Sequence, residues 1–294
     1  MTATVMDALA HRDQQRAVWD HVSQGWLGWQ PEFERGANAV TARLLELAGI
    51  AAGQSVLDIG SGIGEPALSA ARAVGPSGRV LGVDLSPAMV AAARDAAARP
   101  ASVEAGEVEF LVGDLETAEL PPRSFDVALS RWGLMFAADR LELLRVTAGL
   151  LRPGGVLAAA TWGQPPDVPI ISLAFRVISR HLGLPPPPPG PGPFSMSDPR
   201  AVRAELEQAG FTEIDVTELV APFRFDSVED FLGFSRDVLP PGLKQRLDQQ
   251  CGSVDDAGVW NAFAAAAREF ETAQATVSLP SVSLCVRAVA AGGA

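Results

Sequence analysis

Tyrosine is absent from this sequence of 294 residues, and cysteine and histidine are scarce. The two cysteines, Cys251 and Cys285, have no metal-binding or redox-active spacing, and the three histidines, His11, His21 and His181, lie far apart in the chain. We therefore expect no metal site, because zinc sites read from sequence show closely patterned ligands. Unpaired cysteines fit a reducing compartment. The missing tyrosine removes one common acid–base side chain.

Basic residues are also in short supply. Lysine and arginine total 23 against 35 aspartates and glutamates, which gives a formal net charge of -12. Such an acidic surface repels phosphates, so we expect neither nucleic acid nor a membrane as a partner. No stretch reaches the roughly 20 apolar residues of a membrane span, and the opening MTATVMDALAHRDQQR has no apolar signal segment. We expect a cytoplasmic protein with a small-molecule substrate, and a homodimer stays possible.

Residues 55–165 alternate short apolar runs with glycine-rich turns and alanine-rich stretches, a pattern that predicts βαβ units and a parallel sheet. The predicted strands are Ser55–Ile59, Arg79–Asp84, Val108–Val112, Phe125–Ser130 and Gly155–Thr161. The predicted helices between them are Glu65–Val74, Pro87–Ala98 and Asp139–Leu150. Prolines at helix starts and the sequence RPGG after the last helix agree with these boundaries.

The flanking sequence predicts a helical prelude over residues 1–50, an insertion over 165–197 and further helices over 227–272. The insertion combines a helix, Ile170–Leu182, with an extended proline-rich run over 184–194. Asp198 should cap a helix that ends at Gly210. Strands are expected at Phe211–Val220 and Ala275–Val289, the latter with a bulge at Pro280. We expect one domain over residues 1–294, with its core at 40–164, 198–224 and 274–290. The cap or lid comprises 1–35, 165–197 and 225–273.

The segment Val56–Glu65, VLDIGSGIGE, joins a buried strand to a helix through a glycine-rich turn. Gly60, Gly62 and Gly64 allow positive φ angles and a close approach of backbone to a ligand. A turn that binds nothing has the same pattern, so the loop alone is a weak signal. Asp84 ends the next strand about 20 residues later, where a carboxylate can bind both hydroxyls of a ribose.

Further acids sharpen this prediction. Asp114 ends the third strand, where it can accept from an adenine amino group or cap a helix. Asp58 precedes the loop, and Glu65 stands where a dinucleotide-binding motif has its third glycine. Two carboxylates repel a pyrophosphate but suit the ammonium and sulfonium of S-adenosylmethionine (SAM). SAM is therefore the predicted cofactor.

Four motifs resemble those of the class I SAM-dependent methyltransferases, and within them the ubiquinone/menaquinone-biosynthesis C-methyltransferases. They are VLDIGSGIG, VLGVDLSPAMVAAAR, FLVGDLETAELPPRSFDVALSRWGLMF and LLRPGGVLAAATWG, all within residues 40–164. The resemblance implies an α/β, Rossmann-like, seven-stranded and mostly parallel sheet with an antiparallel last strand and a helical cap. It implies SAM binding, with S-adenosylhomocysteine as product. The predicted cofactor site comprises Asp58, Gly60, Ser61, Gly62, Gly64, Asp84, Leu85, Met89, Gly113, Asp114, Leu115 and Ser130.

Four residues are expected to line the substrate pocket. Trp26 and Trp29 belong to a tryptophan-rich run of the prelude, which in the resembling family folds over SAM. Arg131 and Trp132 follow the fourth strand, at the edge where ligands of open α/β sheets bind. Packing in the hydrophobic core is the alternative for each tryptophan.

Methyl transfer from a sulfonium is an in-line displacement, to which positioning contributes strongly. A general base is needed only where the nucleophile must lose a proton. His21 is the first candidate, because an unperturbed histidine titrates near neutral pH, and His181 is the second. A purely structural or exposed role is the alternative for both.

These observations predict a SAM-dependent C- or O-methyltransferase of a small, fairly apolar metabolite, resembling a natural product or a quinone. Two other hypotheses use the same cofactor site: a non-methylating enzyme, such as a cyclase, and a SAM-binding protein without catalysis. The fourth strand lacks the Asn/Asp-Pro-Pro-aromatic motif, which disfavours nucleobase and protein-amide substrates. Two cysteines supply too few sulfur ligands for arsenic methylation.

Overall fold

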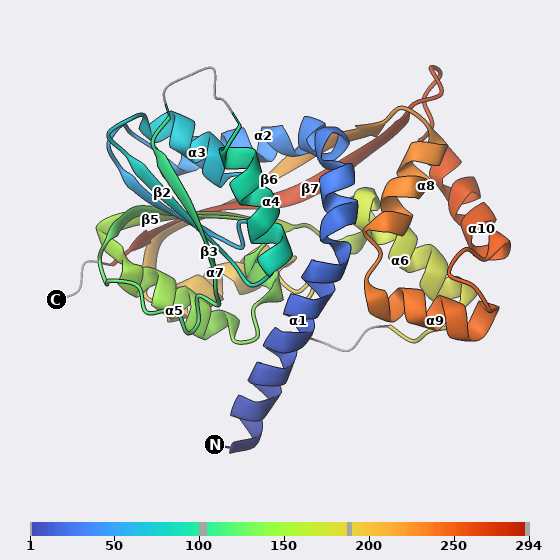
Figure 1. The fold of residues 1–294 in the computed structure, drawn as a ribbon, viewed down its shortest axis with the longest axis horizontal. Coiled ribbons are helices and arrows are strands. Elements are labelled where there is room, and N and C mark those ends of the chain that lie inside the picture. The colour runs from blue at the N-terminus through green and yellow to red at the C-terminus, as the bar shows by residue number, and fades with distance from the viewer. Residues whose placement is uncertain (1, 100–104, 187–189, 292–294) are drawn as a thin grey trace.

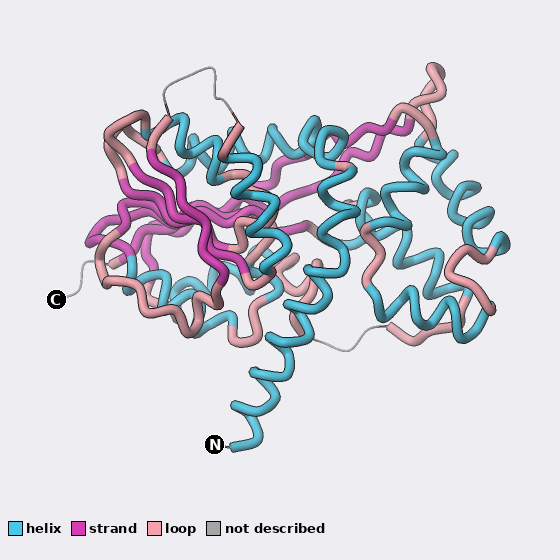
Figure 2. Tube along the Cα trace, viewed as in Figure 1, coloured by secondary structure: helices cyan, strands magenta, loops and turns pink. Residues whose placement is uncertain are grey.

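The computed structural model describes residues 2–99, 105–186 and 190–291. Within those ranges, its centre is a seven-stranded sheet in the order β3-β2-β1-β4-β5-β7-β6 (Figures 1 and 2). β1 to β5 run parallel, and β7 is antiparallel to both of its neighbours, β5 and β6. The strands are β1 Ser55–Ile59, β2 Arg79–Asp84, β3 Glu107–Val112, β4 Phe125–Arg131, β5 Leu151–Trp162, β6 Phe211–Phe225 and β7 Val277–Ala290. The predicted Rossmann-like sheet with an antiparallel last strand is confirmed.

Helices cover both faces of this sheet. α2, α3 and α4 lie on one face, and α5 and α7 on the other (Figure 1). The α-helices are α1 Thr2–Gly28, α2 Gln30–Ala48, α3 Ala67–Val74, α4 Pro87–Ala97, α5 Arg140–Leu150, α6 Pro169–His181, α7 Pro199–Gln208, α8 Val228–Asp237, α9 Pro241–Cys251 and α10 Ala257–Ala267. None in the described ranges combines the length and apolarity needed to cross a bilayer. We call α6, α8, α9 and α10 the cap; they gather beyond one end of the sheet (Figure 1).

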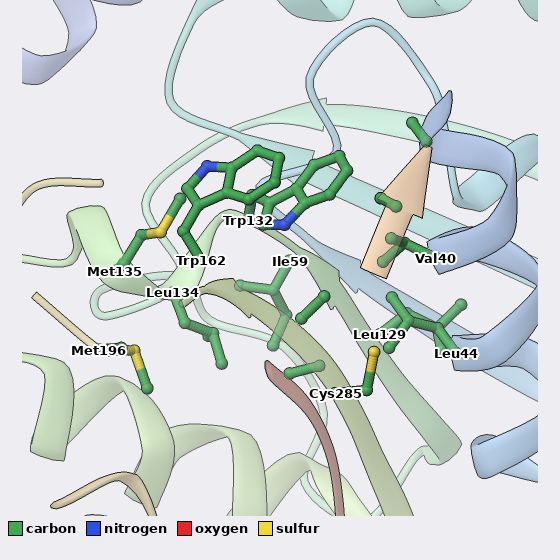
Figure 3. Packing of buried hydrophobic residues seen from close by; sticks show 14 of the residues in the cluster. Val40, Leu44, Ile59, Leu129, Trp132, Leu134, Met135, Trp162, Met196 and Cys285 are labelled. Carbon is green, nitrogen blue, oxygen red and sulfur yellow. The ribbon is translucent and has the colours of Figure 1, made fainter. Parts of the chain in front are cut away.

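The core forms where the central strands meet α2 and α3. Every residue of β1 is buried, and only Ser55 and Asp58 among them are polar. Figure 3 shows Leu44 of α2 beside Leu129 of β4, and both side chains are fully buried. Full burial of one leucine contributes about 1.5–3 kcal/mol. This packing fixes the carboxyl ends of β1 and β4 relative to each other.

Polar caps set the starts of several helices. The Ser86 hydroxyl accepts the N–H of Met89 at 3.1 Å at the start of α4, and Asp139 accepts the N–H of Glu142 at 3.0 Å at the start of α5. Asp198 caps α7, as predicted from the sequence. α3 begins at Ala67, two residues later than expected.

The final hairpin corrects one prediction. Pro280 pairs opposite Pro222 in an unbroken register, and the described irregularity lies in β6, between Thr212 and Asp215. The change of apolar parity that suggested a bulge has another cause. Ser281 and Ser283 are buried, so polar side chains occupy the inward positions of β7. The predicted proline-rich run over 184–194 lies partly outside the described residues, at 187–189.

α1 connects the sheet region to the cap. The helix continues through Gly25, although glycine lowers helix propensity. A Cβ at Gly25 would lie 2.7 Å from the carbonyl oxygen of Asp237 in α8. Glycine is therefore required there by the close contact between α1 and α8.

Candidate functional site

The carboxyl ends of β1, β2 and β4 open into a cavity of about 590 Å³, a usual size for a small-molecule site. Residues 14–26 of α1 form a second side, and the cap helices α6, α8 and α9 form the far side. This is the edge at which open α/β sheets bind ligands. The fold therefore builds one cavity from the sheet, the prelude and the cap.

The glycine-rich loop and Asp84 form a single hydrogen-bonded unit at the sheet edge. The Gly62 N–H donates to Asp84 Oδ2 at 2.8 Å, and the Ser86 N–H donates to Oδ1 at 2.9 Å. Gly62 has a φ of 52°, in the left-handed region that favours glycine. Burial raises the pKa of Asp84, while the bonds from Ser86 and Gly62 oppose that rise.

Asp58 lies behind the loop, with none of its surface exposed. Its Oδ2 accepts the Ala67 N–H at 3.0 Å, and its Oδ1 has no hydrogen-bond partner in the described part of the chain. Burial raises the pKa of Asp58 to about 8, although the positive charge of Arg131 opposes the rise. The Ser61 hydroxyl is also buried without a partner among the described residues. A ligand with a positive group and a hydrogen-bonding group would satisfy both side chains.

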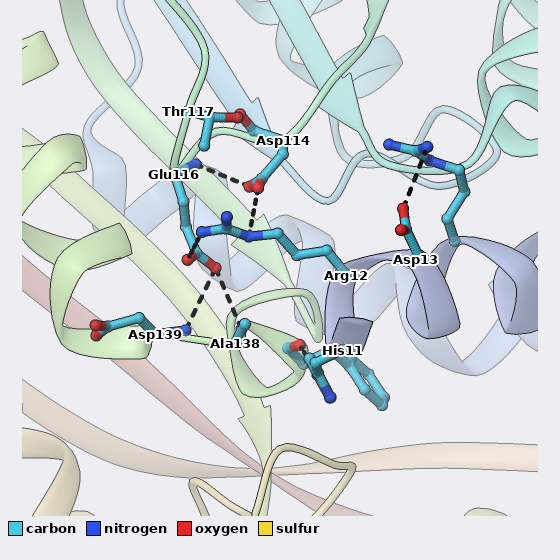
Figure 4. Close-up of polar contacts among 10 residues, drawn as sticks. His11, Arg12, Asp13, Asp114, Glu116, Thr117, Ala138 and Asp139 are labelled. Atoms are coloured by element: carbon cyan, nitrogen blue, oxygen red, sulfur yellow. Dashed lines mark hydrogen bonds and ion pairs between the residues drawn. The ribbon is translucent and has the colours of Figure 1, made fainter. Parts of the chain in front are cut away.

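The third acid, Asp114, is held by the prelude helix. Arg12 Nε lies 2.7 Å from Asp114 Oδ2, and the same guanidinium pairs with Glu116 (Figure 4). Asp114 Oδ1 accepts the Glu116 N–H at 2.9 Å, and Glu116 also accepts the Ala138 N–H at 3.2 Å. Arg12 therefore connects α1 to the loop after β3.

A second contact fastens α1 nearby. Asp20 accepts hydrogen bonds from the Ser86 hydroxyl and from the Ala88 N–H, the latter at 3.2 Å. Asp20 thus reaches from α1 to the start of α4, beside the residues that hold Asp84. Together with Arg12, Asp20 keeps one face of α1 against the loops that follow β2 and β3.

Aromatic rings form the opposite wall of the cavity. Trp132 and Trp162 stack with centroids 4.2 Å apart and an interplanar angle of 11°, and the Trp132 indole donates to Ser283 Oγ at 3.2 Å. Trp26 meets Phe234 of the cap edge-on at 5.6 Å. These contacts position flat apolar surfaces at the end of the cavity away from Asp84.

Two polar groups interrupt this wall. Arg131 pairs with both carboxylate oxygens of Glu34, one at 2.7 Å, and donates to the Thr41 hydroxyl at 2.7 Å. Ser235 is among the residues that line the cavity and is 3% exposed, and its buried hydroxyl has no hydrogen-bond partner among the residues described. A buried hydroxyl without a partner costs about 1–3 kcal/mol, so Ser235 is suited to bind a polar atom of a ligand.

The structure brings most of the predicted cofactor residues together. Those that line the cavity are Gly60, Ser61, Gly62, Asp84, Leu85, Met89, Gly113, Asp114 and Leu115. Three others support the loop from behind, outside the described lining: Asp58, Gly64 and Ser130, whose hydroxyl donates to the Ile59 carbonyl at 2.8 Å. Trp26, Arg131 and Trp132 of the predicted substrate pocket also line the cavity.

Three of the predicted residues lie outside the described lining of the cavity. Trp29 lies outside the described lining, because its indole donates to Asp237 at 2.8 Å and its ring packs on Gly233. His21 is exposed on α1 and His181 is exposed in the cap, and neither is among the lining residues described. The helical phase that turns Val22 inward turns His21 outward.

Sequence reasoning missed several lining residues. Trp19 and Phe136 meet edge-on at 5.0 Å beside the cofactor edge. Glu34, Trp162 and Ser235 come from three further elements. The helical spacing of residues 15, 18, 19, 22 and 26 could have indicated the face that α1 presents. No local signal marks the other positions, because tertiary packing alone brings them together.

Comparisons with known proteins bear on this site. Residues 57–159 match the family model described as Methyltransferase domain. An arsenite methyltransferase of Halobacterium salinarum is 35% identical over 169 residues, which cover 58% of this chain and 40% of that protein. The ubiquinone/menaquinone biosynthesis C-methyltransferase UbiE of Hahella chejuensis is 33% identical over 135 residues, 46% of this chain and 53% of that protein. The chain thus matches about half the length of these curated relatives, or less.

Among solved structures, the YcgJ protein of Bacillus subtilis superposes with a TM-score of 0.56 at 18% identity. The superposition covers 87% of this chain and all of that one, and it shows a shared fold. The matched family segment spans β1 to β5 and contains the glycine-rich loop and the three acids. The chain therefore contains a class I SAM-dependent methyltransferase domain and resembles the UbiE C-methyltransferases.

Proposed function

We propose that this chain is an enzyme that transfers the methyl group of SAM to carbon or oxygen of a small, fairly apolar metabolite, resembling a natural product or a quinone. The observation that carries the proposal is the single cavity, with carboxylates and glycine backbone at one end and stacked aromatic rings at the other. The first end suits a cationic nucleoside, and the second suits a flat acceptor. The unpaired cysteines support the cytoplasm as its compartment.

The cofactor end fits SAM by the chemistry of its donors and acceptors. Asp84 would bind the ribose hydroxyls, and Asp114 with Leu115 would bind the adenine, as the resemblance to methyltransferases implies. The buried Ser61 hydroxyl lines the cavity without a partner among the described residues, so it suits a polar group of the methionyl end. When bound, SAM supplies a methyl group on a sulfonium, an excellent leaving group. The protein contributes position, and its aromatic walls exclude water.

The acceptor end favours a particular kind of nucleophile. Glu34 lines the cavity next to Phe33 in the sequence, and its pairing with Arg131 neutralises its charge. The described lining contains no histidine, cysteine or lysine. A proton on a weakly acidic nucleophile would have no evident acceptor there. We therefore propose an acceptor that is already ionised near neutral pH, such as an activated carbon acid or a phenol made more acidic by electron-withdrawing groups.

The arsenite relative raises a different substrate class, which the cavity does not favour. Soft metalloids are bound by thiolates. Cys285 is buried in β7 and Cys251 ends α9, and neither is found in the described lining of the cavity. An organic acceptor is the better fit.

The test is a screen with methyl-labelled SAM against phenols, quinols and matched non-ionising analogues. We expect label transfer to an ionising acceptor, with one S-adenosylhomocysteine released for each methyl transferred. SAM binding without transfer to any acceptor would support the non-catalytic hypothesis. A rearranged product without label would support a non-methylating enzyme.

A further inference from the structure

Three residues with metal-binding side chains meet in the cap, away from the cavity just described. A ring nitrogen of His181, the thiol sulfur of Cys251 and a carboxylate oxygen of Asp256 all lie within 4.8 Å of one another. Their sequence separation hides this grouping, because 70 residues separate the histidine from the cysteine. We propose that these three residues form a Zn²⁺ site that joins three helices of the cap.

The ligands come from the ends of three helices that Figure 1 shows together. His181 ends α6, Cys251 ends α9, and Asp256 is the N-cap of α10. Helix ends are fixed in position by the packing of each helix, so the three side chains are brought together by the fold. The proposed ion would connect α9 and α10, which a short loop joins, to α6, which α7, β6 and α8 separate from them in the chain.

Local contacts hold the carboxylate in place. The Val259 N–H donates to Asp256 Oδ1 at 3.0 Å, which fixes the side chain and leaves Oδ2 available to a metal. The loop between cysteine and aspartate is also held, because the Trp260 indole donates to the Val254 carbonyl at 2.8 Å. Hydrogen bonds that orient ligands in this way support metal binding in proteins generally.

A glycine leaves room for the imidazole. A Cβ at Gly258 would lie 3.4 Å from His181 Cε1 and 3.0 Å from Asp256 Oδ1. The distance to Asp256 Oδ1 is tight and that to His181 Cε1 is an ordinary van der Waals contact, so the imidazole and the carboxylate lie directly against the first turn of α10. Glycine is otherwise unfavourable within a helix by about 1 kcal/mol relative to alanine.

The ligand chemistry selects zinc among common divalent ions. Thiolate and imidazole favour Zn²⁺, whereas Mg²⁺ and Ca²⁺ prefer oxygen ligands. A thiolate and a carboxylate together balance the two charges of the ion. Tetrahedral zinc requires ligand atoms about 3.3–3.6 Å apart, which rotation of these partly exposed side chains can reach from the observed 4.8 Å limit. Water would complete the fourth position, as it does in other sites with three protein ligands.

Zinc at this position would restrict the motion of the cap helices that line the cavity. α6 carries Ile170 and Phe175, and α9 carries Leu243, all of which line the cavity. Fixing the distal ends of α6 and α9 restricts the motion of these helices. The inference stands independently of the proposed methyl transfer, because it concerns the cap alone.

The test uses the full chain after dialysis against a chelator, titrated with ZnCl₂ in a calorimeter. We expect one Zn²⁺ per chain. Cys251→Ser and His181→Gln should each weaken binding by about tenfold or more, since each removes a direct ligand. His21→Gln is the matched control, because it removes an exposed histidine that is not part of the cluster, and it should bind as the wild type does. Unchanged affinity in Cys251→Ser, or no stoichiometric binding by the wild type, overturns the proposal.

Two further measurements distinguish this site from adventitious surface binding. Co²⁺ in place of Zn²⁺ should give a thiolate charge-transfer absorption band, which disappears in Cys251→Ser and persists in His21→Gln. Zinc should raise the thermal midpoint of the wild type but not of Asp256→Asn, in which asparagine still caps α10. A cobalt band that survives loss of Cys251, or an equal thermal shift in Asp256→Asn, would show that the ion binds elsewhere.

Discussion

The cofactor edge of the cavity is formed by residues that lie close together in sequence, at the ends of β1, β2 and β3. The aromatic wall instead collects side chains from α1, β4, β5 and α8. The first region is held by backbone hydrogen bonds to carboxylates, as between Gly62 and Asp84. The second is held by ring packing and buried side-chain contacts. Substitutions should therefore separate the regions: changes at the edge should alter cofactor affinity, and changes in the wall should alter stability and acceptor use.

The largest expected effect lies in the wall. Trp162→Ala removes a ring that is 3% exposed and stacked 4.2 Å from Trp132. We expect it to lower the free energy of unfolding by about 3–5 kcal/mol, measured by urea denaturation. Val220→Ala, at an exposed position of β6, should change it by less than about 0.5 kcal/mol. Equal losses in both variants would contradict the assigned role of the stack.

The second largest effect is expected at the cofactor edge, on the affinity for SAM. Asp84→Asn keeps the shape of the side chain but removes the charge that should bind the ribose. We expect SAM to bind about ten- to hundredfold more weakly in calorimetry, the usual loss for a hydrogen bond to a charged group. Asp95→Asn, on the exposed side of α4, is the control. The control should bind SAM as the wild type does. If Asp84→Asn also binds SAM as the wild type does, Asp84 is not a ribose ligand.

Asp58 predicts a dependence of stability on pH. Its pKa is about 8 in the folded chain and near 3.9 when unfolded, so between these values the folded state holds an extra proton. Stability contributed by the protonated carboxyl is therefore complete below pH 4 and is lost as the pH rises towards 8. The slope is at most about 1.4 kcal/mol per pH unit. Asp58→Asn should flatten it in denaturation measured from pH 5 to 8. A parallel profile in the variant would contradict this assignment.

The smallest effect concerns Ser235. Ser235→Ala removes a buried hydroxyl without a partner, so we expect stability to stay constant or rise by about 1 kcal/mol. SAM affinity should not change, whereas the KM for an acceptor found in the labelled screen should rise. Steady-state kinetics with calorimetry separates the two quantities. A loss of SAM affinity would instead place Ser235 at the cofactor end.

The same contrast explains how much could be predicted. The strand β1, the loop at Gly60 and Asp84 were identified because local sequence alone specifies a strand, a tight turn and the next strand end. Trp29 lies outside the described lining because it follows the end of α1 and its indole donates to Asp237, a contact that depends on the position of α8. The grouping of His181, Cys251 and Asp256 was invisible for the same reason: no spacing rule connects residues brought together by helix packing.

The tryptophan wall has a practical consequence. With no tyrosine and six tryptophans in the chain, intrinsic ultraviolet emission comes almost entirely from indole rings. Four of those rings, Trp19, Trp26, Trp132 and Trp162, line the cavity. Any molecule that enters it changes the surroundings of most of the emitting groups. The protein therefore carries its own optical reporter of ligand entry, and candidate acceptors can be ranked by fluorescence without a label.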